Sequence, residues 1–264
     1  MRFDIFTLFP AYFDGPFGSS ILKRGLDCGA ISIGLHDIRD FCDDKHRRAD
    51  DAPFGGGAGM VMKAEPVARA LESVLNFDVG SKPPCPIIYL SPQGRTLNHK
   101  IVLELATLSH IALLCGHYEG IDERAIQCCV TDEISLGDFV LTGGESAAAV
   151  LVESVSRFVP DVLGNEASAA GDSFSNGLLE APCYTRPASW REMDVPETLL
   201  SGHHGEIEKW RFREGLRRTM LRRPELVEIA LRELPFSRWQ LKIYAELQRE
   251  LKEKHDESGH SSPG

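Results

Sequence analysis

Short apolar runs alternate with segments of helical spacing over residues 1–162. The runs typical of strands are 3–9, 30–36, 86–90, 111–115 and 131–136. Helices are expected over 18–28, 66–75, 101–108 and 148–159, where apolar residues recur at helical spacing. Strands that alternate with helices form a parallel sheet, so the pattern predicts an α/β domain.

Three successive strands each end in a polar loop that contains glycine. These loops are 91–95, 116–124 and 135–144. Ligands of parallel sheets bind beyond the carboxyl ends of the strands, so we expect the three loops to converge on one site. Loop 135–144 contains three glycines and leads directly into a helical segment, which suits a ligand that backbone groups contact closely.

A fourth glycine-rich segment, 53–60, has glycine at four of five consecutive positions. Its spacing does not match the dinucleotide-binding fingerprint, because Met60 stands where the last glycine is needed. No Gly-Lys-Ser or Gly-Lys-Thr follows, so the segment is not a phosphate-binding P-loop. These two observations argue against a Rossmann enzyme that acts on a small molecule.

The composition narrows the class of protein. With 42% apolar and 26% charged residues, the chain has the content of a soluble globular protein, and it contains no apolar run long enough for a membrane span. The seven cysteines are scattered and form no Cys-x-x-Cys pair. We therefore expect a cytoplasmic protein with reduced thiols and no structural metal site.

The pattern changes after residue 162. Segment 163–176 has little apolar content and predicts a flexible linker, followed by a helical domain at 177–251 and a disordered polar tail at 252–264. Residues 209–223 hold seven basic residues and one acid in a chain of net charge −10, which favours a phosphate-binding surface. The alternative for residues 209–223 is a helix face exposed to solvent. The alternative for the charged run 43–51 is a loop exposed to solvent.

Ten short motifs, in order along the chain, resemble the bacterial tRNA (guanine-N1)-methyltransferase family, whose members methylate guanosine 37 beside the anticodon. They lie at 8–10, 50–60, 89–94, 115–124, 135–145, 154–158, 163–168, 172–174, 184–187 and 199–202. Each motif alone is a weak signal, but ten in one order are specific.

The resemblance implies a SPOUT-type fold, in which the cofactor-binding end of a parallel sheet is tied in a deep trefoil knot. It also implies a small, mostly helical C-terminal domain, a homodimer with an active site shared between subunits, S-adenosylmethionine as methyl donor, and a dependence on Mg²⁺. The residues expected to bind the donor are Tyr89, Leu90, Ser91, Pro92, Gln93, Gly94, Gly116, Tyr118, Gly120, Ser135, Leu136, Gly137, Asp138, Phe139, Val140, Leu141, Gly143 and Gly144.

Guanine N1 carries a proton at neutral pH, so methyl transfer to it needs a general base. By family position the base is Asp172, and Arg157 stabilises the charge that develops on guanine O6. Glu119 is expected to contact the guanine or the surroundings of the sulfonium. The residue types alone leave other roles open. Asp172 could be an ordinary linker or helix-capping residue, Arg157 could form a surface ion pair, and Glu119 could cap a helix.

Two basic surfaces are expected to bind RNA. Their residues are His46, Arg47, Arg48, Arg211, Arg213, Arg217, Arg218 and Arg222. The chain departs from many relatives at His117, where arginine is common, and at Ala58, Ser146 and Ala147. A SPOUT enzyme that acts on another RNA position or on a ribose 2′-hydroxyl is one alternative. A non-catalytic RNA-binding protein is another, and it would be expected to have lost the acids or the glycine loops.

Overall fold

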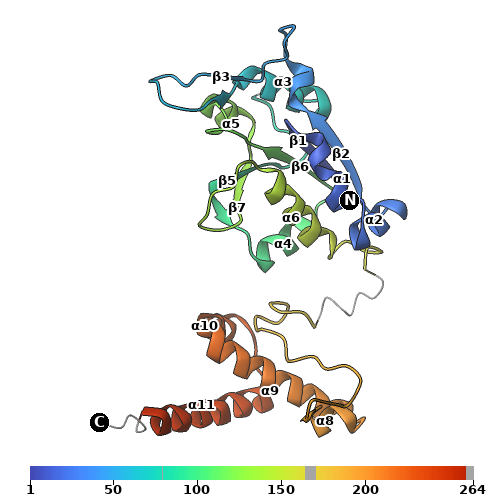
Figure 1. Ribbon diagram of the computed structural model, residues 1–264, viewed down its shortest axis with the longest axis vertical. Helices are drawn as coiled ribbons and strands as arrows, with labels where there is room; N and C mark the ends of the chain where they lie inside the picture. The colour runs from blue at the N-terminus through green and yellow to red at the C-terminus, as the bar shows by residue number, and fades with distance from the viewer. Residues whose placement is uncertain (79, 164–170, 260–264) are drawn as a thin grey trace. The chain divides into compact units, whose positions relative to one another are not determined.

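The computed structural model describes residues 1–78, 80–163 and 171–259, and the chain divides into two units, Met1–Glu166 and Ala167–Gly264 (Figure 1). The first unit is built on a parallel five-stranded sheet of order β2-β1-β6-β5-β7. Its strands are β1 (Arg2–Thr7), β2 (Ser32–Asp37), β5 (Ile87–Thr96), β6 (His110–Cys115) and β7 (Asp132–Ser135). The predicted α/β class is therefore confirmed.

Alternate side chains of the strands face two separate layers of helices. On one side, Phe3 and Ile5 of β1 are buried with α2 (Ser20–Asp27), α4 (His99–Ala106) and α6 (Glu145–Ser156). On the other side, Phe6 is buried with α3 (Ala64–Leu75), α5 (Glu123–Cys129) and the 3₁₀ helix η2 (Ile38–Phe41). Successive side chains of a strand point to opposite faces of the sheet. Because helices cover both faces here, nearly every side chain of a strand must be apolar, which explains the continuous apolar runs in the sequence.

Short elements complete the first unit. The 3₁₀ helix η1 (Pro10–Phe13) and α1 (Asp14–Phe17) follow β1. The glycine-rich segment 53–60 is held between β3 (Asp50–Asp51) and β4 (Val61–Met62), which pair in antiparallel register. The trefoil knot stays a prediction.

The segment 91–95, expected as a loop after the strand, belongs instead to strand β5. Leu90 and Arg95 both pair with Ile134 of β7, so residues 91–94 form a bulge between two pairings with the same residue. That expectation was wrong because the bulge depends on the neighbouring strand, which local turn chemistry does not reveal.

The second unit is mainly helical. After the hairpin of β8 (Ser189–Trp190) and β9 (Met193–Asp194) come α8 (Glu197–Leu200), α9 (His204–Arg222), α10 (Pro224–Glu233) and α11 (Arg238–Gly259). Leu178, Leu216, Val227 and Leu247 form its core. None of the helices in the described parts of the chain is long and apolar enough to cross a membrane.

Two of the predicted boundaries fall partly outside the described residues. Of the linker predicted at 163–176, residues 164–170 lie outside, and residues 171–177 form turns and bends. The disordered tail predicted at 252–264 is wrong for 252–259, because α11 continues to Gly259. Lysine and glutamate, which dominate 252–254, are good helix formers, so the polar composition there extends the helix.

One buried carboxylate joins three strands of the sheet. Asp4 of β1 is fully buried, and its two oxygens lie 2.7 Å from Nε2 of His36 on β2 and 2.7 Å from Nε2 of His110 on β6. Arg2 Nε approaches the same carboxylate at 2.7 Å. Burial alone raises the pKa of Asp4, but the hydrogen bonds from His36, Arg2 and His110 outweigh it and hold the pKa well below the usual range.

We predict that Asp4→Asn lowers the free energy of unfolding by about 3 kcal/mol at pH 7, since it removes one partner of a buried charge network. The folded-state pKa of Asp4 lies below that of an unfolded aspartate, so its contribution is complete above about pH 5 and is lost as the pH falls towards the folded value. Urea unfolding at pH 7 and pH 3.5 measures both effects. The exposed Asp78→Asn is the control, and an equal loss in both variants would contradict the prediction.

Candidate active site

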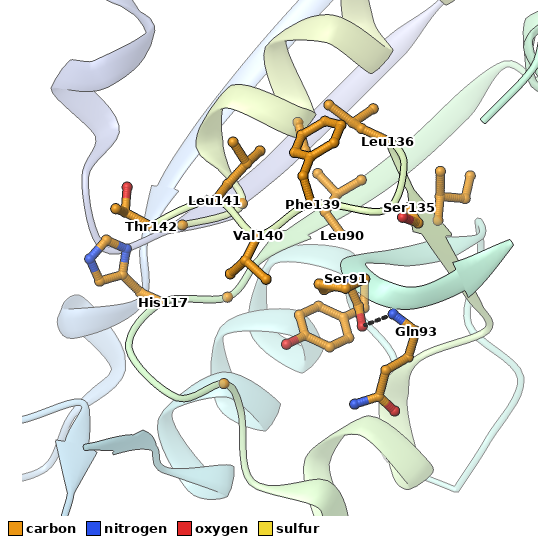
Figure 2. Close-up of a pocket in the computed structure, with 18 of the residues that line it drawn as sticks. Leu90, Ser91, Gln93, His117, Ser135, Leu136, Phe139, Val140, Leu141 and Thr142 are labelled. Carbon is orange, nitrogen blue, oxygen red and sulfur yellow. Dashed lines mark hydrogen bonds between the residues drawn. The ribbon is translucent and has the colours of Figure 1, made fainter. Parts of the chain in front are cut away.

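The bulge inside β5 and the two loops that follow β6 and β7 line one cavity of about 310 Å³ (Figure 2). The predicted donor-binding residues that line it are Tyr89, Leu90, Ser91, Pro92, Gln93, Gly116, Tyr118, Gly120, Ser135, Leu136, Phe139, Val140, Leu141, Gly143 and Gly144. Glu119 lines it as well, whereas Gly94, Gly137 and Asp138 do not. The lining also includes His117, Ile134, Thr142 and Ala147, which were not on the predicted list.

The bulge of β5 forms one wall. Within it, Ser91 Oγ accepts a hydrogen bond from the Gln93 amide at 3.1 Å. A Cβ atom at Gly94 would overlap the backbone of Glu133 and Ile134, so only glycine lets the bulge lie this close to β7. The bulge brings the polar side chains of Ser91 and Gln93 to the cavity, and the strand continues beyond it to Thr96.

A second close backbone contact joins the other two loops. The Gly144 amide donates to the Gly116 carbonyl at 2.8 Å, and His117 forms a single antiparallel bridge with Gly143. A Cβ atom at position 144 would lie 2.8 Å from Cα of Cys115, which is too close for any other residue to fit without a backbone shift. The end of β6 and the start of α6 therefore form one continuous wall.

The remaining wall is apolar. Ser135 Oγ accepts a hydrogen bond from the Gly137 amide at 3.1 Å, which turns the chain after β7. Val140, beyond this turn, is 85% exposed, and Phe139 and Leu141 are also exposed. In the view of Figure 2, the apolar side chains of Leu136, Phe139 and Leu141 lie above the polar side chains of Ser91 and Gln93.

Backbone hydrogen bonds connect loop 116–120 to the end of the glycine-rich segment 53–60. The Glu119 amide donates to the Met60 carbonyl at 3.0 Å, and the Met62 amide donates to the Gly120 carbonyl at 2.9 Å. Glu119 itself is exposed at the cavity. The segment 53–60, which matched no nucleotide-binding motif, thus lies beside the only carboxylate that lines the cavity in the described structure.

A second acid, Glu145, lies behind the cavity and contacts other residues of the protein. The carboxylate of Glu145 is 4% exposed and accepts a hydrogen bond from Thr7 Oγ1 at 2.7 Å. Its other oxygen lies 3.9 Å from Nδ1 of His117, a buried atom with no hydrogen-bond partner among the described residues. Glu145 therefore connects β1 to the start of α6.

The charges of the lining restrict the ligand. No lysine or arginine lines the cavity in the part of the chain that the structure describes. Burial raises the pKa of the Tyr89 hydroxyl, and burial together with the Glu145 charge raises the pKa of Cys115 well above that of a free thiol. Neither group supplies a nucleophile at neutral pH. The cavity suits a neutral or cationic ligand with an apolar part, and it lacks the cationic side chains that bind phosphate.

The sequence profile of the family described as tRNA (Guanine-1)-methyltransferase TrmD matches residues 1–229 of this chain. The chain belongs to this family. A tRNA (guanine-N(1)-)-methyltransferase of Geobacter sp. (strain M21) is 52% identical over 254 residues, which cover 96% of this chain and 99% of that protein. One of Chloroflexus aggregans is 57% identical over 227 residues, 86% of this chain and 88% of that protein.

Family membership confirms the resemblance found in the sequence and makes the chain a methyltransferase by class. Two of the residues expected in catalysis lie outside the cavity lining. Arg157 follows α6 as its exposed C-cap residue. Asp172 belongs to the second unit, where its carbonyl accepts hydrogen bonds from the amide and the hydroxyl of Ser175 at 3.2 and 2.7 Å. Their catalytic roles stay predictions.

The basic residues expected to bind tRNA differ in their surroundings. Arg213 pairs with Glu246 at 2.9 Å and with Glu250, and Arg217 pairs with Glu250 at 3.0 Å, so both connect α9 to α11. Arg47, in the first unit, forms an ion pair with Asp40. The charged run 43–51 alone did not indicate this pair. In contrast, no described acid pairs with the other predicted arginines and histidine, which are His46, Arg48, Arg211, Arg218 and Arg222.

We predict that Gly94→Ala lowers the free energy of unfolding of this methyltransferase by about 1–3 kcal/mol, because the added methyl group overlaps backbone that cannot rotate away. Gly15→Ala is the matched control, since a Cβ atom there meets nothing within 4 Å. Denaturant unfolding of the two variants measures the difference. Equal stability would show that the bulge does not need glycine.

Proposed function

We propose that this protein transfers a methyl group from S-adenosylmethionine to N1 of guanosine 37 in tRNA, with the donor bound in the glycine-walled cavity. The observation that carries the proposal is the cavity's combination of one apolar wall and closely packed backbone with no cationic side chain among the described residues that line it. The donor has an aromatic adenine and a positively charged sulfonium, and it lacks phosphate. Leu136 and Leu141 pack against the adenine ring, and backbone groups of the β5 bulge form hydrogen bonds with its polar edge.

The proton on guanine N1 is assigned to Asp172. An aspartate can accept this proton if it reaches N1 within hydrogen-bond distance, and removal of the proton places negative charge on O6. Arg157, as a permanently charged guanidinium, stabilises that charge. Glu119 is assigned to the guanine side of the donor cavity, where its carboxylate accepts hydrogen bonds from the base. The bound S-adenosylmethionine supplies the electrophilic methyl carbon.

We extend the proposal to the assembly. The exposed apolar side chains at Phe139, Val140 and Leu141 are of the kind that a second subunit covers, which supports a homodimer with a shared active site. We also propose that the first unit contains the SPOUT-type trefoil knot. No group of three or more metal-ligating side chains exists in the described residues, so a required Mg²⁺ would take most of its ligands from RNA phosphates and water.

The direct test is to incubate the protein with labelled S-adenosylmethionine and unmodified tRNA transcripts that carry G or A at position 37, and then to map the methyl group. We expect label at N1 of guanosine 37 and none on the A37 transcript. Label on another base or on a ribose 2′-hydroxyl would support a different RNA methyltransferase. Tight tRNA binding without any transfer would support a non-catalytic binding protein.

We further predict that Asp172→Asn reduces the single-turnover rate at least about a hundredfold, the usual contribution of a general base, while the affinity for the donor stays near that of the natural sequence. Asp161→Asn, at an exposed aspartate of the first unit, is the control and is expected to keep its activity. Retained transfer by the Asp172 variant would overturn the assignment of the base.

A further inference from the structure

The second unit contains a hollow of about 490 Å³ that the sequence did not predict. Residues 182–186, 188, 195, 199, 200, 207, 210 and 211 line it. The rings of Tyr184 and Trp210 stand at its side with their centroids 6.3 Å apart and their planes at 56°. Two aromatic faces at this separation leave flat apolar surface beside an opening to solvent, because Tyr184 is 48% exposed.

The charge of the hollow is wholly positive. Arg186 and Arg211 line it, and no aspartate or glutamate is among its lining residues. Neither arginine has an acidic partner in the described structure, unlike Arg213 and Arg217, which lie two and six residues after Arg211 on α9. In a chain of net charge −10, cations left unpaired beside aromatic rings indicate an anionic partner with flat groups.

The β8–β9 hairpin continues this surface. Its base closes on the hollow through the hydrogen bond from the Val195 amide to the Ala188 carbonyl at 2.8 Å, and both of these residues line the hollow. At its tip Trp190 is 55% exposed, and the guanidinium of Arg191 lies 4.7 Å from the centroid of its ring. A third aromatic side chain, with an arginine over its ring, thus stands on the hairpin that leads out of the hollow.

We propose that this hollow binds an unpaired base of the substrate RNA, stacked against Tyr184 and Trp210, with Arg186 and Arg211 on the adjoining phosphates. Trp190 stacks on a further unpaired base. Aromatic faces combined with arginines bind single-stranded nucleic acid with little base preference, since every base has a stacking face. Loop nucleotides offer such bases, whereas paired nucleotides do not. The inference rests on the proposed function and places the main RNA contact of the second unit here, away from the ion-paired Arg213 and Arg217.

The test measures binding of the full-length protein to an anticodon stem-loop RNA without S-adenosylmethionine. We expect Tyr184→Ala to raise the dissociation constant about tenfold, the usual effect of losing one stacking side chain. Arg186→Gln, an exposed substitution that leaves the core intact, is expected to weaken binding and to reduce the slope of log affinity against log salt by about 1. Arg232→Gln, at an exposed arginine of α10, is the matched control.

A second measurement reports on the hollow itself. With Trp190→Phe and Trp239→Phe in place, Trp210 is the remaining tryptophan, and stacking of a loop base should quench its fluorescence, while a fully paired hairpin of the same length should not. Binding by the Tyr184 and Arg186 variants equal to that of the Arg232 control, with unchanged Trp210 fluorescence, would overturn the inference and leave methylation of tRNA untouched. If the protein with its natural sequence bound no RNA at all, the proposed function would be overturned instead.

Discussion

The cavity exists because segments of backbone lie closer together than side chains allow. The bulge of β5 rests on β7 at Gly94, and the start of α6 rests on the end of β6 at Gly144. These two contacts bring three segments, far apart in the sequence, to one cavity. Such contacts cost conformational entropy on folding, since glycine is the most flexible residue in the unfolded chain. A well-packed two-layer core beneath the loops offsets that cost.

The surfaces of the two units suit two different ligands. The cavity of the first unit has an apolar wall, one carboxylate and no cationic side chain among the described residues, which suits a positively charged methyl donor. The second unit carries Arg186 and Arg211, which no described acid pairs with, beside the exposed side chains of Tyr184 and Trp190, and these groups suit RNA. An overall charge of −10 opposes indiscriminate binding of nucleic acid, so recognition depends on this local surface rather than on the net charge.

The sequence revealed those features that depend on local period. Apolar spacing located the five strands, because burial on both faces of a parallel sheet needs near-continuous apolar runs, but it did not indicate the short helix α5 between β6 and β7. The bulge at 91–94 was missed because it is defined by two pairings with Ile134, a residue remote in the sequence. The ion pairs of Arg213 and Arg217 were missed for the same reason, since their partners Glu246 and Glu250 lie on another helix. The candidate site was predictable as a set of loops, and its missing members, such as Ile134 and Ala147, lie on the elements that flank them.

The central claim is that the backbone contact between β6 and α6 builds the methyl-donor site. Isothermal titration of S-adenosylmethionine into Gly144→Ala and into the Gly15→Ala control tests it most directly, because a Cβ atom at 144 meets the backbone of Cys115 and one at 15 meets nothing within 4 Å. The account predicts a loss of at least about tenfold in donor affinity, or about 1.4 kcal/mol, for Gly144→Ala alone. Equal donor affinity in the two folded variants would contradict it.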